Sequence, residues 1–504
     1  MIPEATQRAW QVFAQAARSV SSSRPRVVES GRVLSVGDGI VRASGLEEVK
    51  AGEIVQLSHN SVAMVLDLSE DGVGVILLND APKIEAGSPV FRTHSVAEVP
   101  VGEHLLGRII DPVGRPLDAG AAISRGHTYP IERLPRPITD RAPVERPLQT
   151  GVKSIDALIP IGRGQRQLIL GDRQTGKTQV GVDTILNQRD QNMLCVYLAV
   201  GQRTAATAQV VQALRKNDAL RYTVVMVAGA SSPAGLRYLA PYAATSVGEY
   251  FMEHGQDVLV VYDDLSKHAD TYREMSLLLR RPPGREAFPG DIFYVHSRLL
   301  ERATQLRPEL GGGSLTALPI VETQAQNLSA YIPTNIISIT DGQVYLDPVM
   351  YSQGLLPAVD IGLSVSRVGG KAQLPAYGAV SGRLRLAYSQ FRELEMFARF
   401  STRLDASSQR AIDRGRRLRE ILKQNLNSPC SVPEQIAVLL AVAEGVFDKL
   451  AVEKVALAEQ TIRQQVTADS ESFADITRKR KPLDDDMKNR LLDLARKAVD
   501  SLET

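Results

Sequence analysis

The stretch Gly171-Asp-Arg-Gln-Thr-Gly-Lys-Thr178 decides how the rest of the sequence is interpreted. It fits the pattern G-x-x-x-x-G-K-[ST], in which glycines let backbone N–H groups approach phosphate oxygens. The apolar run 168–170 precedes it, and the helix-compatible run 180–185 follows it. A phosphate-binding loop needs this strand–loop–helix context, because the helix N-terminus favours anions. The sequence therefore predicts a nucleoside triphosphate site at the end of a strand.

The residue types of this loop match the chemistry of a Mg²⁺-bound nucleotide. Lys177 adds a positive charge for the terminal phosphates, and Thr178 offers a hydroxyl to Mg²⁺. Asp263 ends the apolar run 258–262, where an aspartate can hold the water shell of the ion. The predicted metal contacts are Thr178 and Asp263. The predicted nucleotide contacts in the loop are Gly171, Asp172, Arg173, Gln174, Thr175, Gly176, Lys177 and Thr178.

Hydrolysis also requires a group that orients or deprotonates water. The best-placed candidate is Gln202, just after the second predicted strand. An amide can hydrogen-bond water but cannot accept its proton. The sequence thus predicts a well-equipped binding site without a catalytic carboxylate at this position.

The composition and net charge of the chain limit the classes of partner that it can bind. The chain has 504 residues, 43% of them hydrophobic and 23% charged, and a net charge of +2. These values are typical of a globular protein with large cores, and the balanced charge argues against nucleic-acid binding or a broad membrane-binding face. The longest aliphatic run, 436–443, is too short to span a bilayer. We therefore expect any membrane connection to go through partner proteins.

The pattern along the chain predicts a multidomain fold in four segments. Residues 1–25 form an amphipathic helix and linker, whose apolar face docks either on its own domain or on a partner. Residues 26–93 have the short alternating runs of a small β-barrel. Residues 94–375 alternate strands and helices, as in a mainly parallel α/β P-loop (RecA-like) domain, with strands expected at 167–170, 194–200, 223–227, 258–262 and 335–339. Residues 376–504 are predicted to be α-helical.

Several stretches together carry a resemblance to a known family. They are 171–178, 201–203, 262–267, 278–286, 297–302, 314–319, 331–335 and 363–367. Over essentially its whole length the chain resembles the α subunits of F-type rotary ATP synthases, including divergent second-copy variants. Residues 172–175 and Gln202 are of the α type rather than the catalytic β type.

The resemblance implies an alternating α/β hexamer around a rotating γ shaft, in which α holds ATP or ADP with Mg²⁺ without turning it over. Such a complex makes ATP from ADP and phosphate with a transmembrane H⁺ or Na⁺ gradient. The resemblance also implies that Arg367 reaches the neighbouring β site as an arginine finger. Residues 1–20 would hold a δ-type stalk subunit. The chain would lie on the cytoplasmic face of a bacterial inner membrane, contacting it only through the ion-translocating sector.

Two positions depart from the family pattern at the expected adenine pocket. Gln424 matches one of a usual glutamine pair, but the second position is Leu426. Leu356 stands where the family usually has an arginine. Losing two buried hydrogen-bonding groups would weaken base recognition by ~1–3 kcal/mol each. We therefore expect altered affinity or base selectivity.

Two other ATPase classes fit the phosphate loop as alternatives. A hexameric RNA translocase requires a basic, aromatic N-terminal barrel, whereas 27–91 has one aromatic residue and many carboxylates. A secretion-type ATPase would be catalytically competent alone, and Gln202 argues against this. A purely structural module would have no use for Arg367.

Overall fold

The computed structural model describes residues 29–79, 84–124, 126–398, 405–478 and 481–503. The predicted N-terminal helix lies outside the described residues. The chain divides into two compact units, residues 1–95 and 96–504, which are described separately below. The four predicted segment boundaries stay predictions.

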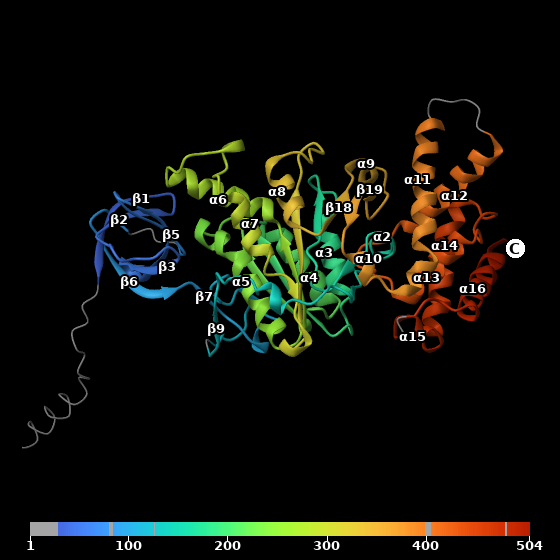
Figure 1. Cartoon of the computed structure of the whole chain (residues 1–504), viewed down its shortest axis with the longest axis horizontal. Coiled ribbons are helices and arrows are strands. Elements are labelled where there is room, and N and C mark those ends of the chain that lie inside the picture. The colour runs from blue at the N-terminus through green and yellow to red at the C-terminus, as the bar shows by residue number, and fades with distance from the viewer. Residues whose placement is uncertain (1–28, 80–83, 125, 399–404, 479–480, 504) are drawn as a thin grey trace, which may run out of the picture. The chain divides into compact units, whose positions relative to one another are not determined.

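The first unit contains the expected β-barrel. Six strands close it in the order β1-β2-β5-β4-β3-β6. Closure pairs every strand on both sides, so that no sheet edge is left. The core consists of inward-facing aliphatic residues such as Val41, Val55 and Val75. The strands are β1 (Ser30–Gly37), β2 (Ile40–Ser44), β3 (Glu53–Leu57), β4 (Ser61–Ser69), β5 (Gly72–Leu77) and β6 (Pro89–Val96), drawn in blue in Figure 1.

The second unit is built on a nine-stranded sheet. Its main path runs β19-β18-β12-β17-β15-β13-β14-β8, and β16 pairs with β17 outside this path. Pairs along the path are parallel, except the antiparallel pair of β18 with β19. The strands are β8 (Ile109–Ile110), β12 (Leu168–Gly171), β13 (Met193–Val200), β14 (Thr223–Ala228), β15 (Asp257–Asp263), β16 (Thr304–Gln305), β17 (Ser314–Glu322), β18 (Gly342–Leu346) and β19 (Val359–Ser366). The predicted α/β class is confirmed.

One predicted strand is wrong. Residues 335–339 belong to helix α8 (Tyr331–Ile339), whose buried residues Ile332, Ile336 and Ile339 recur at helical spacing. The five residues 335–339 are too few to show this helical spacing, because a brief apolar run fits either a strand or a helix. Strands β17, β18 and β19 were not predicted, and β17 is almost entirely buried between β12 and β15.

Helices flank the sheet and place its functional loops. Helix α3 (Lys177–Leu186) contacts β12, β15 and β17, and α5 (Ala234–Glu253) contacts β13, β14 and β15. Further helices are α2 (Lys153–Leu158), α4 (Thr204–Lys216), α6 (Leu265–Leu278), α7 (Ile292–Leu300), α9 (Pro348–Ser352) and α10 (Gly369–Ala372). Figure 1 shows α3 and α4 beside the central strands.

The C-terminal part is helical, as predicted. Its helices are α11 (Ser381–Ala398), α12 (Ala406–Leu422), α13 (Val432–Ala443), α14 (Val452–Ala468), α15 (Ser470–Arg478) and α16 (Asp485–Glu503). Leu384, Tyr388 and Phe391 form a buried apolar stripe on α11. One hydrophobic cluster joins these helices to the sheet, including Ile169 on β12 and Ile436 on α13.

A buried ion pair also joins the sheet region to the helical part. The Lys153 ammonium on α2 contacts the Glu459 carboxylate on α14, and the lysine side chain is 1% exposed. Removing one partner of a buried pair leaves the other charge unpaired in a low-dielectric surrounding. This contact therefore fixes the helical part against α2.

We predict that Glu459→Ala lowers the free energy of unfolding by about 3–5 kcal/mol, because it leaves the buried Lys153 charge without its partner. Urea unfolding of the purified chain measures this change. Arg496→Ala is the control, since Arg496 forms an exposed pair with Asp493, and it should change stability by less than ~1 kcal/mol. Equal effects of the two substitutions would contradict the prediction.

Candidate functional site

The phosphate loop has the predicted position between a strand and a helix. Strand β12 ends at Gly171, and α3 begins at Lys177. Gly176 caps the helix with φ of 92°, a left-handed conformation that a side chain would strain. The N–H groups of the first helical turn have no intrahelical acceptor, so this end of α3 suits an anion.

Lys177 lies in the pocket with restricted access to solvent. It is 7% exposed, and its ammonium donates a hydrogen bond to the Asp172 carbonyl oxygen. Burial lowers the pKa of Lys177, whereas the surrounding carboxylates, led by Glu322, raise it. A phosphate would add further negative charge close to this cation. The position fits the predicted task of pairing with terminal phosphates.

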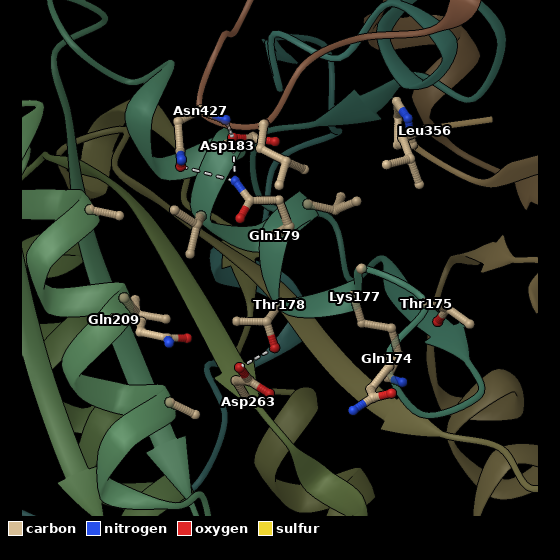
Figure 2. Close-up of a pocket in the computed structure, with 18 of the residues that line it drawn as sticks. Gln174, Thr175, Lys177, Thr178, Gln179, Asp183, Gln209, Asp263, Leu356 and Asn427 are labelled. Carbon is tan, nitrogen blue, oxygen red and sulfur yellow. Dashed lines mark hydrogen bonds between the residues drawn. The ribbon is translucent and has the colours of Figure 1, made fainter. Parts of the chain in front are cut away.

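Asp263 brings three other residues together. Its carboxylate is buried and accepts hydrogen bonds from the Thr178 hydroxyl at 2.7 Å, the Tyr197 hydroxyl at 2.8 Å and the Gln202 amide at 2.9 Å. Figure 2 shows the contact with Thr178. Burial raises the pKa of Asp263, and these bonds oppose the rise. Two of the predicted site residues, Thr178 and Gln202, therefore contact a third, Asp263. Tyr197 was not predicted as a site residue, because it lies inside a buried strand.

The adjacent Asp264 differs from Asp263 in the groups that surround its carboxyl and shift its pKa. Burial and the neighbouring Asp263 charge raise the pKa of Asp264 to about 7. Its side chain accepts a hydrogen bond from the Lys267 backbone N–H at 2.8 Å and caps α6. Asp264 therefore has a structural task at the start of a helix, and Asp263 is the carboxylate that faces Thr178.

A further carboxylate on the pocket wall, Glu322, was not predicted. It ends β17, and it forms ion pairs with Arg173 at 3.2 Å and Lys267 at 3.6 Å. Both cations contact the same carboxylate oxygen, Oε2. Its position could have been found only with β17 assigned, because parallel strands end at one edge of the sheet.

The loop residues divide into those that line the pocket and those that shape the loop. The lining includes residues 174–178. The Asp172 carboxylate accepts a hydrogen bond from the Thr323 hydroxyl at 2.5 Å and one from the Gln326 backbone N–H at 3.0 Å. Its carbonyl oxygen accepts from Thr175 and Lys177. Asp172 therefore holds the loop in shape.

The pocket has a volume of about 720 Å³ and extends from the phosphate loop to an apolar end. Tyr351, Leu356 and Leu426 line that end. Gln424 also lines it, but its amide nitrogen donates to the Gly151 and Ser428 carbonyl oxygens at 2.7 and 2.8 Å. The predicted adenine-flanking amide is thus already hydrogen-bonded to the backbone.

A polar cluster that sequence reasoning missed lies beside this end. The Gln179 amide donates to an Asp183 carboxylate oxygen at 2.8 Å and to the Asn427 side-chain oxygen at 3.0 Å, as Figure 2 shows. Burial raises the pKa of Asp183 to about 6. Gln179 and Asp183 are four residues apart on α3, a spacing visible in the sequence, but Asn427 joins them only through the fold.

Arg367 lies outside this pocket. It directly follows β19, and its backbone N–H donates to the Asp341 carbonyl oxygen at 3.0 Å. The side chain is exposed. Within the described part of the chain, no carboxylate forms an ion pair with the Arg367 guanidinium. The arginine is therefore available to a group outside this chain.

Among the described helices, none combines the length and apolar character needed to cross a membrane.

Three family models match the chain. The barrel, nucleotide-binding and C-terminal domains of the ATP synthase alpha/beta family match residues 27–94, 151–366 and 373–498. These matches cover most of the chain.

Curated relatives are similar over nearly the whole length. ATP synthase subunit alpha 2 of Syntrophus aciditrophicus is 56% identical over 95% of this chain and 93% of the relative. ATP synthase subunit alpha 1 of Rhodopirellula baltica is 53% identical over 98% of both. ATP synthase subunit alpha 2 of Polaromonas naphthalenivorans is 60% identical over 86% of this chain and 84% of the relative. With the phosphate loop and its fold in place, the chain belongs to the ATP synthase alpha/beta family.

Proposed function

We propose that this chain is the noncatalytic, nucleotide-binding α subunit of a rotary ATP synthase. The observation that carries the proposal is the Gln202 amide, which donates to Asp263 at 2.9 Å where hydrolysis would need a proton acceptor. Glu322, on the same pocket wall, is paired through Oε2 with Arg173 and Lys267. A pocket with phosphate-binding groups, and with an amide where hydrolysis would need a carboxylate, would retain a nucleotide rather than cleave it.

The pocket residues fit ATP or ADP with Mg²⁺. The phosphates would lie at the start of α3 beside Lys177. Mg²⁺ prefers oxygen ligands and keeps several waters, and the Thr178 and Asp263 oxygens meet within 2.7 Å at the same edge of the pocket. These two residues would hold the ion, Asp263 through water. When bound, the ion neutralises phosphate charge.

Arg367 would act on a neighbour's nucleotide. An exposed guanidinium without an ion-pair partner in the described chain can make forked contacts to a transferring phosphoryl group. In the complex we propose, α alternates with catalytic β subunits around a γ shaft, and a δ-type stalk subunit binds residues 1–20. The complex uses a transmembrane H⁺ or Na⁺ gradient to make ATP at the cytoplasmic face of the bacterial inner membrane.

We predict that Arg367→Ala lowers turnover of the complete complex by about 10³-fold or more, because the transition-state charge loses its cation. Nucleotide bound in this chain's own pocket should stay unchanged, since Arg367 does not line it. ATP hydrolysis by the purified complex and its bound-nucleotide content measure the two effects. Arg496→Ala is the matched control for loss of an exposed arginine. Full turnover by the Arg367 variant would refute the arginine-finger role.

We predict that Lys177→Ala abolishes nucleotide binding in the pocket of this chain, while the β sites continue to turn over ATP. The cause is loss of the buried cation that pairs with the phosphates. Bound nucleotide is counted in the full-length chain, and the initial hydrolysis rate is measured in the complex. If the substitution abolished turnover from the first cycle while the complex stayed assembled, the noncatalytic assignment would fail.

A further inference from the structure

We propose that Tyr197 is a positioning residue for Mg²⁺, because its hydroxyl holds the Asp263 carboxylate in the orientation that the water shell of the ion requires. This role rests on the proposed function, in which Asp263 meets the ion through water beside Thr178. Tyr197 does not line the pocket. It therefore acts on the ion only through Asp263, and it is not a catalytic residue.

The register of the sheet explains how Tyr197 reaches Asp263. Strand β13 runs parallel to β15, and Ala199 on β13 lies opposite Asp263 on β15. Tyr197 lies two residues before Ala199, so the side chains of these two residues point to the same face of the sheet. Because Ala199 carries only a methyl group, it leaves space beside the carboxylate for the longer tyrosine. Tyr197 is 1% exposed and Asp263 is 2% exposed.

The hydrogen bonds to Asp263 are divided unequally between its two carboxylate oxygens. Oδ2 accepts from the Thr178 hydroxyl at 2.7 Å, a contact drawn in Figure 2, and from the Tyr197 hydroxyl at 2.8 Å. These two bonds occupy both lone pairs of Oδ2. Oδ1 accepts from the Gln202 amide at 2.9 Å. A carboxylate has about four acceptor sites, so the bonds from described residues leave one site, on Oδ1, for a water of the ion.

Tyr197 differs from the other two donors, because nothing in the pocket competes for its hydroxyl. Thr178 would also offer a lone pair to Mg²⁺, and Gln202 lines the pocket, where a nucleotide can contact its amide. The torsion that turns a carboxylate about its Cβ–Cγ bond is broad, so hydrogen bonds set its orientation. Loss of an outer-shell donor of this kind typically lowers metal affinity by about 10–100-fold.

The ring and the hydroxyl of Tyr197 have separate tasks. The ring packs in the hydrophobic cluster that also contains Val180 on α3 and Leu318 on β17. A phenylalanine would supply the same ring. The hydroxyl adds a donor that a buried carboxylate needs, since desolvation of a charge without hydrogen bonds is costly. A substitution that removes the hydroxyl and keeps the ring therefore isolates the positioning role.

The test is Tyr197→Phe in the purified full-length chain. The dissociation constant of ATP is measured by equilibrium dialysis with Mg²⁺ and, separately, with EDTA. We call the ratio of the EDTA constant to the Mg²⁺ constant the Mg²⁺ gain. We expect Tyr197→Phe to reduce the Mg²⁺ gain about tenfold and to change the EDTA constant by less than about twofold, since Lys177 and the start of α3 are unaltered.

Tyr262→Phe is the matched control. Tyr262 is also 1% exposed, directly precedes Asp263 on β15, and shares a hydrogen bond of 2.9 Å with the Thr245 hydroxyl. Neighbours on a strand point to opposite faces, so this variant loses a buried hydroxyl on the other side of the sheet. It should keep the Mg²⁺ gain of the unsubstituted chain.

An unchanged Mg²⁺ gain in Tyr197→Phe would overturn the proposal. So would an equal weakening of ATP binding with Mg²⁺ and with EDTA, or the same loss of the Mg²⁺ gain in Tyr262→Phe, because either result indicates a change in packing alone. In these cases the unsubstituted chain still binds ATP, and the proposed function stands. An unsubstituted chain that bound no ATP, or that showed no Mg²⁺ gain, would contradict the proposed nucleotide site and the role of Tyr197 with it.

Discussion

The buried carboxylate of Asp263 is the constraint on which the site depends. A charge at this depth requires hydrogen-bond donors, because desolvation without them is costly. Three donors reach it, from Thr178 at the start of α3, Tyr197 on β13 and Gln202 after that strand. These contacts tie the phosphate loop to the carboxyl ends of β13 and β15. The position of the phosphate loop relative to these two strands therefore depends on this one group.

In the function we propose, the same constraint separates nucleotide binding from catalysis. Gln202 satisfies Asp263 as a hydrogen-bond donor, which a carboxylate at that position could not do without a proton. A glutamate there would place two negative charges side by side, and the pKa of one would rise. In the proposed function, the Gln202 amide therefore stabilises the Asp263 carboxylate and cannot act as a general base. Arg367 lies at the end of an edge strand, exposed and outside the pocket. We propose that its guanidinium acts on a group outside this chain's own pocket.

The parts of the site that share a local motif could be predicted from the sequence. The loop 171–178 and Asp263 lie in strand–loop–helix and strand-end contexts that short patterns reveal. The barrel and the helical C-terminal part also followed from periodicity. Strand β17 was missed because Ser314, Thr316 and Pro319 interrupt the apolar run that marked the equally buried β13 and β15. Glu322 was missed with it. The contacts among Gln179, Asp183 and Asn427 were missed for another reason, since the loop bearing Asn427 lies far from α3 in sequence and only the fold brings it there.

The central claim is that the pocket holds a nucleotide without cleaving it. The most direct measurement is the fate of ATP labelled at its γ-phosphate and bound to the full-length chain alone with Mg²⁺. After a time equal to many catalytic cycles of the complete complex, the bound label should be recovered as intact ATP. Release of labelled phosphate at the rate of the complex would contradict the account, because it would require a proton acceptor in a pocket where Gln202 supplies only an amide.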